Sequence, residues 1–404
     1  MKIKYNSLKC FLISCIFIFS DILGGGNLNL TYLLGLLMII PLLYDRQYFK
    51  RLIFLWVPLI VIAVLSKEFS GISQNNIKLF VYLAKLFLCI TLMYGIEKNF
   101  RYYDYYRIYN NCLNLIIILL FISLICNNNS TLWRLNDPYN DFSKIRLQLL
   151  FTEPSVLGLL TGVMTVFGVY SFMQTKIMNI EKIRMLLLMV TLILTFSMSG
   201  IMYTLISCTF LIVMMVKKSL LNRKLKDSEF AIYIVVAILL IYIFLTDNVI
   251  SRRLIAIITG NDGSFNFRWR VSYNSLGNIM QKTNYFGLGM GNMNTNVGAS
   301  ILLSEGVDHF FSNSFMYFIA ENGVPGLLYI IYLFVYIIRL MLKNRDIKNP
   351  LNLKISLLIF VFVSQIAGGY FTDPFIWCLY GFIGSASVNT EQVLVFKKKL
   401  EERK

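Results

Sequence analysis

The sequence predicts an all-α polytopic membrane protein, with about 12 transmembrane helices and one large loop before the last three. Of the 404 residues, 57% are hydrophobic and only 15% are charged, whereas soluble domains carry roughly 25% charged residues. Apolar runs long enough to cross a bilayer recur from one end of the chain to the other. Runs such as "FAIYIVVAILLIYIFL" lack the alternation of barrel strands, so the backbone must satisfy its hydrogen bonds within helices.

The expected spans follow from these apolar runs and from the breaks between them. The N-terminal stretch begins with lysines, like a signal peptide, but shows no clear small-residue cleavage site, so we expect it to remain as the first span. The run from Arg184 to Val216 is too long for one helix, and "SMSG" at 197–200 offers the break of a tight hairpin. The expected spans are about 9–24, 27–44, 52–66, 78–96, 111–126, 154–173, 184–198, 200–216, 229–246, 324–341, 354–370 and 373–388.

The charge distribution predicts the orientation of these spans. Placing both termini in the cytoplasm puts most of the 38 basic residues on that side, as the positive-inside rule requires. The net charge of +17 is thereby explained by topology, and nucleic acid is not an expected partner. The expected organisation is helices 1–9 in residues 1–246, with an outside loop at about 127–153, then a large outside loop at 247–323, and three spans with a basic cytoplasmic tail in 324–404.

Several kinds of cofactor site have no counterpart in the sequence. The seven cysteines fall in or beside apolar runs without paired spacing, so we expect neither disulfides nor zinc. No Walker loop and no clustered metal-ligand motif is present either. We therefore expect no metal and no cofactor, and an enzyme of this kind would receive a substrate that is already activated.

Arginines gather in the large outside loop, against the usual sorting of positive charge. Guanidinium groups stay ionised and present a planar fork that suits phosphate oxygens, and Trp269 adds an interfacial aromatic side chain. An anionic lipid headgroup or a diphosphate is the natural partner. The alternative is that these arginines pair with Asp262, with Asp308 or with surface phospholipids. The arginines are Arg252, Arg253, Arg268 and Arg270.

Two residues at the outer edge of the expected spans are candidate bases. Glu153 directly precedes Pro154 at the mouth of a span, where a carboxylate also stabilises a helix N-terminus. His309, the only histidine of the chain, follows Asp308 at the end of the large loop, and imidazole can take a proton near neutral pH. For each residue a structural role and a catalytic role both remain open.

Three further stretches carry local signals. "YFGLGMGN" at 285–292 is no dinucleotide fingerprint, and we interpret it as a flexible turn, with a phosphate-binding backbone nest as the alternative. Asn322-Gly323 and Pro325-Gly326 predict a break before the next span, and Asp373-Pro374 predicts the start of the last one.

The order of these stretches resembles the O-antigen polymerase and ligase superfamily. The likeness rests on "GSFNFRWR" followed by "NYFGLGMGN", on "DHFFSNSFMYFIAENGVPGLL" and on "DPFIWCLYGF". The resemblance implies a C-type glycosyltransferase fold and a metal-independent, inverting transfer from a lipid diphosphate at the outer face of the bacterial inner membrane. It also implies that Arg268, with Arg253 and Arg270, binds diphosphate, and from the cluster we expect the neighbouring Arg252 to bind it too.

The resemblance also gives the two candidate bases different weight. His309 matches the base position of ligases, but this chain has "HFFSN" where ligases commonly show "HN". "EPS" at 153–155 resembles polymerases, which makes Glu153 the rival base. We therefore expect a polymerase acting on an undecaprenyl-diphosphate-linked oligosaccharide, with membrane lipids and a chain-length regulator membrane protein as further partners. The alternatives are an O-antigen ligase that transfers the glycan to lipid A core, and a lipid-linked glycan flippase or transporter.

Overall fold

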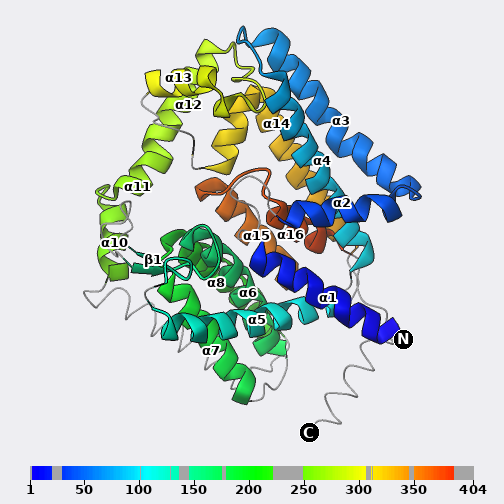
Figure 1. Cartoon of the computed structure of the whole chain (residues 1–404), viewed down its shortest axis with the longest axis vertical. Coiled ribbons are helices and arrows are strands. Elements are labelled where there is room, and N and C mark those ends of the chain that lie inside the picture. The colour runs from blue at the N-terminus through cyan, green and yellow to red at the C-terminus, as the bar shows by residue number, and fades with distance from the viewer. Residues whose placement is uncertain are drawn as a thin grey trace.

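The computed structural model shows an almost wholly helical chain (Figure 1). It describes residues 2–20, 30–100, 102–127, 129–135, 145–174, 179–221, 249–305, 311, 313–344 and 350–385. The helices of the first half are α1 (Lys2–Phe19), α2 (Leu30–Leu42), α3 (Arg46–Phe69), α4 (Asn76–Asn99), α5 (Tyr102–Ile125), α6 (Pro154–Gln174), α7 (Asn179–Leu194) and α8 (Met198–Leu221). Those of the second half are α10 (Val249–Ile258), α11 (Gly263–Asn266), the π-helix η1 (Phe267–Val271), α12 (Ser272–Lys282), the 3-10 helix η2 (Asn292–Asn294), α13 (Asn296–Ser304), α14 (Ser314–Lys343), α15 (Leu351–Ala367) and α16 (Pro374–Gly384).

Six helices among the described residues are long and apolar enough to cross a membrane, so this is a multi-pass membrane protein. They are α3, α4, α5, α6, α8 and α14. Shorter apolar helices lie at Leu8–Phe19, Leu30–Leu42, Leu351–Ala367 and Pro374–Gly384. The span expected at 229–246 lies outside the described residues, and the count of 12 spans stays a prediction.

The helices pack closely where glycine replaces a side chain. A Cβ on Gly200 of α8 would lie 2.9 Å from the backbone of Gly158 in α6. A Cβ on Gly381 of α16 would likewise lie 2.4 Å from the carbonyl oxygen of Met93 in α4. Small residues at such crossings let helix backbones approach each other, which is the usual basis of helix association in membranes. In this way α6, α8, α15, α16 and α4 form a continuous packed set (Figure 1).

The predicted helix breaks are confirmed. α7 ends at Leu194 and α8 begins at Met198, so the turn occupies residues 195–197 and ends at the first residue of the "SMSG" stretch. α14 runs through the "ENGVPG" stretch but is kinked at Gly323, whose φ of 65° and ψ of −153° are not helical. Asp373 caps α16 by accepting a hydrogen bond from the backbone N–H of Phe375 at 2.9 Å.

The segment expected as a large loop folds into short helices. In Figure 1 they form an arm along one side of the molecule, from α10 near β1 to α12 and α13 near the ends of α3 and α4 that meet there. The strands β1 (Trp133–Leu135) and β2 (Ile145–Leu147) form an antiparallel hairpin. Arg146 of β2 donates to the carbonyl oxygen of Thr195 at 3.0 Å, so this hairpin is tied to the turn between α7 and α8.

Candidate functional site

Arg268 lies on the π-helix η1 and reaches the end of another helix. Its Nη1 donates to the carbonyl oxygen of Ala367, the last residue of α15, at 3.3 Å. The side chain is partly buried, and its charge acts on the neighbouring Tyr203 of α8. A cation is favoured at a helix C-terminus, where carbonyl groups have no intrahelical partner. π-helices occur often at functional sites, so the irregular turn is a second reason to consider Arg268 functional.

The same end of α15 holds the segment that follows His309. Nδ2 of Asn313 donates to the carbonyl oxygen of Ile366, and Oδ1 of Asn313 accepts from the N–H groups of Phe315 and Met316, both at 3.1 Å. The asparagine therefore caps α14 and joins it to α15. His309 and Asp308 themselves lie outside the described residues. Two stretches singled out in the sequence thus meet at consecutive carbonyl groups of α15.

The other predicted arginines have different surroundings. Nε of Arg253 lies 3.1 Å from Oδ2 of Asp262, and only 15% and 5% of the two side chains are exposed. Oδ1 of Asp262 also accepts from the N–H of Phe265 at 2.7 Å, where α11 begins. Arg253 therefore pairs with Asp262, which was the alternative to diphosphate binding. Arg252 is exposed, and the side chain of Arg270 lies outside the described residues.

We expect the pair of Arg253 and Asp262 to stabilise the start of the arm. In Asp262→Ala the buried guanidinium loses its carboxylate and α11 loses its cap, so the free energy of unfolding should fall by about 2–4 kcal/mol. The thermal midpoint of the purified protein in nanodiscs measures this effect. An Arg253→Met, Asp262→Asn double variant removes both charges and should recover most of the loss, and a thermal midpoint as low as that of Asp262→Ala would contradict the pairing.

Glu153 lies exposed immediately before the first residue of α6. The hydroxyl of Ser155 donates to its Oε2 at 2.8 Å, and its carbonyl oxygen accepts from the N–H of Val156 at 3.1 Å. The carboxylate also acts on Tyr370 in the turn between α15 and α16. Burial and the charge of Glu153 both raise the pKa of Tyr370. Glu153 and Tyr370 are therefore close enough to influence each other, and the tyrosine keeps its proton at neutral pH.

Tyr370 is backed by a buried set of polar side chains that sequence analysis missed. Its ring meets that of Tyr317 edge to face, with centroids 6.1 Å apart and an interplanar angle of 82°. The hydroxyl of Tyr317 accepts from Nδ2 of Asn294 at 2.9 Å and faces the carboxyl group of Glu321. Glu321 is fully buried, and the hydroxyl groups of Tyr317 and Tyr82 lie beside its carboxyl group. The one signal in the sequence is that Tyr317 and Glu321 are four residues apart, a spacing that places both side chains on one face of a helix.

The glycine-rich stretch is not an open phosphate cradle. The N–H groups of Leu288 and Gly289 donate to the carbonyl oxygens of Ala320 and Glu321, both at 2.8 Å. The N–H of Met293 donates to Oε1 of Glu321 at 3.3 Å. The donors that a bound phosphate would need are thus used by α14 itself, and the expected flexible turn is a hydrogen-bonded insert.

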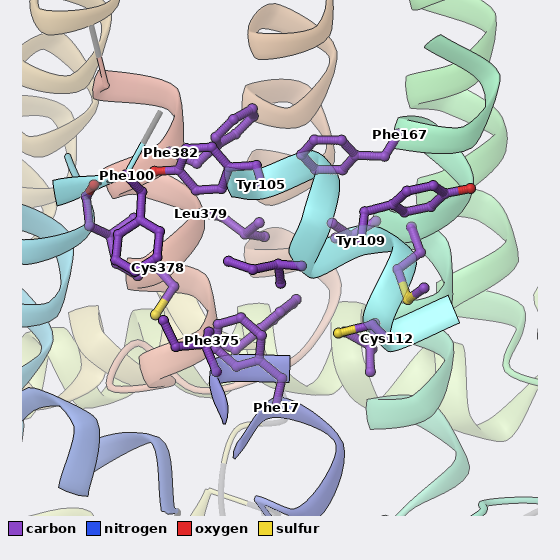
Figure 2. A pocket seen from close by; sticks show the side chains of 16 residues that line it. Phe17, Phe100, Tyr105, Tyr109, Cys112, Phe167, Phe375, Cys378, Leu379 and Phe382 are labelled. Carbon is purple, nitrogen blue, oxygen red and sulfur yellow. Dashed lines mark hydrogen bonds between the residues drawn. The ribbon is translucent and has the colours of Figure 1, made fainter. Parts of the chain in front are cut away.

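An apolar pocket lies between α1, α4, α5, α6 and α16 (Figure 2). Aromatic rings from α1, α5, α6 and α16 point toward it, among them Phe17, Tyr105, Phe167 and Phe375, together with the ring of Phe100, which follows α4. Two of its walls, α6 and α16, begin directly after Glu153 and Asp373. The pocket therefore lies inward from the edge at which Glu153 is exposed.

Comparison with known proteins adds one finding. The model of the O-antigen ligase family matches residues 183–331. This match supports an O-antigen ligase/polymerase-like superfamily. The matched part runs from α7 to the first half of α14, so it contains η1 with Arg268, the glycine-rich insert and Glu321. No curated protein matches the chain.

The match agrees with the resemblance expected from "GSFNFRWR" and "DHFFSNSFMYFIAENGVPGLL". Proteins of this family are glycosyltransferase-like enzymes of the polymerase and ligase type. Glu153 and the residues that line the apolar pocket all fall outside the matched residues. A role of Glu153 or of the pocket in the reaction therefore rests on their geometry alone.

Proposed function

We propose that the protein polymerises O-antigen or a related surface polysaccharide at the periplasmic face of the bacterial inner membrane, with both termini in the cytoplasm. Its substrates would be repeat units linked to undecaprenyl diphosphate. The observation that carries this proposal is the position of Arg268: within the matched segment, a partly buried guanidinium is held at the end of α15 and uses Nη1 to donate to the carbonyl oxygen of Ala367. Such a group can still offer N–H donors to a second, anionic partner.

The proposed reaction is an inverting glycosyl transfer. A hydroxyl oxygen of the acceptor sugar attacks the anomeric carbon, and the bond from that carbon to the diphosphate breaks with its electron pair going to the phosphate oxygen. Negative charge grows on the diphosphate, where Arg268 would stabilise it. The hydroxyl proton passes to a base, for which Glu153 and His309 are the two candidates. Glu153 is favoured by its exposure at the outer edge of α6.

The apolar pocket supports a lipid-linked substrate. Its walls are made by apolar and aromatic side chains (Figure 2), and its lining residues in α6 and α16 follow the first residues of these helices, Pro154 and Pro374. A polyprenyl tail placed there would gain the free energy of burying apolar surface, while its diphosphate stayed at the outer ends of the helices. In this arrangement the tail would confer affinity and Arg268 would act on the reacting group.

The ligase remains the second candidate, because the matching family model is described as that of O-antigen ligase. Deleting the gene and separating the lipopolysaccharide on a gel distinguishes the candidates. A polymerase mutant should show core bearing a single repeat unit, and a ligase mutant should show bare core while the lipid-linked polymer accumulates. A flippase or transporter mutant would leave the lipid-linked unit on the cytoplasmic side. Bare core would reject the polymerase assignment, whether the lipid-linked polymer accumulates or the lipid-linked unit stays on the cytoplasmic side.

A further inference from the structure

Tyr370 presents an aromatic ring at the edge where Glu153 is exposed. It lies in the short turn between α15 and α16, after Gly369, whose φ of 76° is open to few residues other than glycine. Half of the side chain is exposed, although most large aromatic residues near it are buried. Phe371, the next residue, is only 2% exposed and stacks on Phe318 with ring centroids 4.1 Å apart. The turn is therefore anchored on one side and presents Tyr370 on the other.

The exposed ring has a rigid backing. Tyr317 meets it edge to face and is itself only 3% exposed. The hydroxyl of Tyr317 is held by Asn294 of η2, and beneath it the carboxyl group of Glu321 accepts the N–H of Met293. Buried groups of this kind fix a side chain in one position, because moving it would leave polar atoms without partners. The position of Tyr370 is thus set by contacts that come from α14 and from η2.

A rigid, half-exposed aromatic ring beside a carboxylate suits one class of ligand well. The face of such a ring packs against the C–H groups of a sugar ring, and a nearby carboxylate accepts hydrogen bonds from sugar hydroxyl groups. Glu153 directly precedes α6, which packs against α15 so closely that a Cβ on Gly162 of α6 would lie 3.0 Å from the ring of Phe360 in α15. The start of α6 therefore lies beside the turn after α15 that carries Tyr370, and the charge of Glu153 acts on this tyrosine. We propose that Tyr370 is the stacking platform of a sugar-binding subsite, which holds a pyranose ring of the acceptor repeat unit next to Glu153. This inference rests on the proposed function, and Tyr317 and Glu321 are its positioning residues.

Binding of the strain's own glycan to the full-length protein tests this subsite. The probe is the repeat-unit oligosaccharide released by mild acid from the polysaccharide of the same strain, added to the protein in nanodiscs and observed by saturation-transfer NMR. Tyr370→Ala should raise the dissociation constant about five- to tenfold, which corresponds to the loss of one aromatic contact. Tyr370→Phe keeps the ring and should bind like the wild type. Tyr273→Ala, at a 69% exposed tyrosine of α12, is the matched control and should leave binding unchanged.

Three outcomes would overturn the subsite. The first is an unchanged affinity for the oligosaccharide in Tyr370→Ala. The second is a loss of affinity in Tyr370→Phe as large as that in Tyr370→Ala, which would assign the effect to the hydroxyl group. The third is a wild-type protein that does not bind the oligosaccharide. If the Tyr370→Ala protein is absent from the membrane, the wild type decides whether the sugar stacks on an aromatic ring, through transfer of saturation from aromatic protons to the sugar.

Variants of Glu321 test the backing of Tyr370. In Glu321→Ala the backing is lost and the affinity for the oligosaccharide should also fall, whereas Glu321→Gln retains an oxygen acceptor and should keep the wild-type affinity. The deletion phenotype tests the polymerase assignment separately, so a failure of the subsite and a failure of the proposed function can be told apart.

Discussion

Cells that carry Arg268→Ala in place of the wild-type protein should lose the polysaccharide ladder and retain core with a single repeat unit. Loss of one fixed donor to a developing oxyanion costs roughly 10²–10³ in rate, which is enough to remove long chains. Arg268→Lys keeps the charge but not the planar fork, so a ladder that is short and faint is expected. Gel separation of lipopolysaccharide from complemented deletion strains measures both results.

The amount of protein must be compared in the same experiment. Arg268 also contacts the carbonyl oxygen of Ala367, so membrane fractions should be immunoblotted to show that the variant is inserted. Lys282→Ala is the matched control, because Lys282 is another cation of the arm, half exposed and paired with Glu305. A normal ladder in Arg268→Ala, at wild-type protein levels, would reject the assigned role.

Gly287→Ala is expected to lower the stability of the protein about as much as Asp262→Ala. The φ of Gly287 is 80°, and a Cβ at this position would lie 2.6 Å from the backbone of Glu321 and from the nitrogen of Gly323. The conformational strain adds about 1 kcal/mol and the overlap with backbone atoms about 1–3 kcal/mol, so the free energy of unfolding should fall by about 2–4 kcal/mol. Much less folded protein should therefore be recovered from membranes, since this is a large part of a typical total stability.

Gly277→Ala provides the contrast, because Gly277 lies inside α12 with open space around it. Alanine favours a helix interior over glycine by about 1 kcal/mol, so this variant should be as stable as the wild type or more stable. Thermal denaturation of both proteins in nanodiscs gives the comparison. Equal midpoints for Gly287→Ala and the wild type would show that the insert is not packed against α14 as described.

The sequence was most informative where one local pattern determines one local structure. The thickness of the hydrocarbon layer requires long apolar runs, and α3, α4, α6 and α8 lie at the runs that were expected to span it. The kink at Gly323 and the start of α16 after Asp373 likewise follow from residues with strong backbone preferences.

Contacts between distant residues could not be predicted in the same way. The glycine spacing of "YFGLGMGN" suggested a flexible turn, with a phosphate-binding nest of N–H donors as the alternative. The acceptors of these N–H groups are carbonyl oxygens of α14, about thirty residues later, and the carboxyl group of Glu321 in the same helix accepts from Met293. The short helices of the arm were read as a loop because their mixed polar sequence lacks the long apolar runs of the spans. In α10 a regular spacing of Ile255 and Ile258 was nevertheless present, and a test for helical periodicity would have found it.

The two carbonyl groups at the end of α15 give this helix a mechanical role. Arg268 and Asn313 are separated by 45 positions in the chain, yet they are tethered to adjoining peptide units. A tilt of α15 would therefore move the guanidinium group of Arg268 and the beginning of α14 together. Crosslinking the far end of this helix to a neighbour would consequently change the geometry of both tethered segments from a distance, without altering either of them chemically.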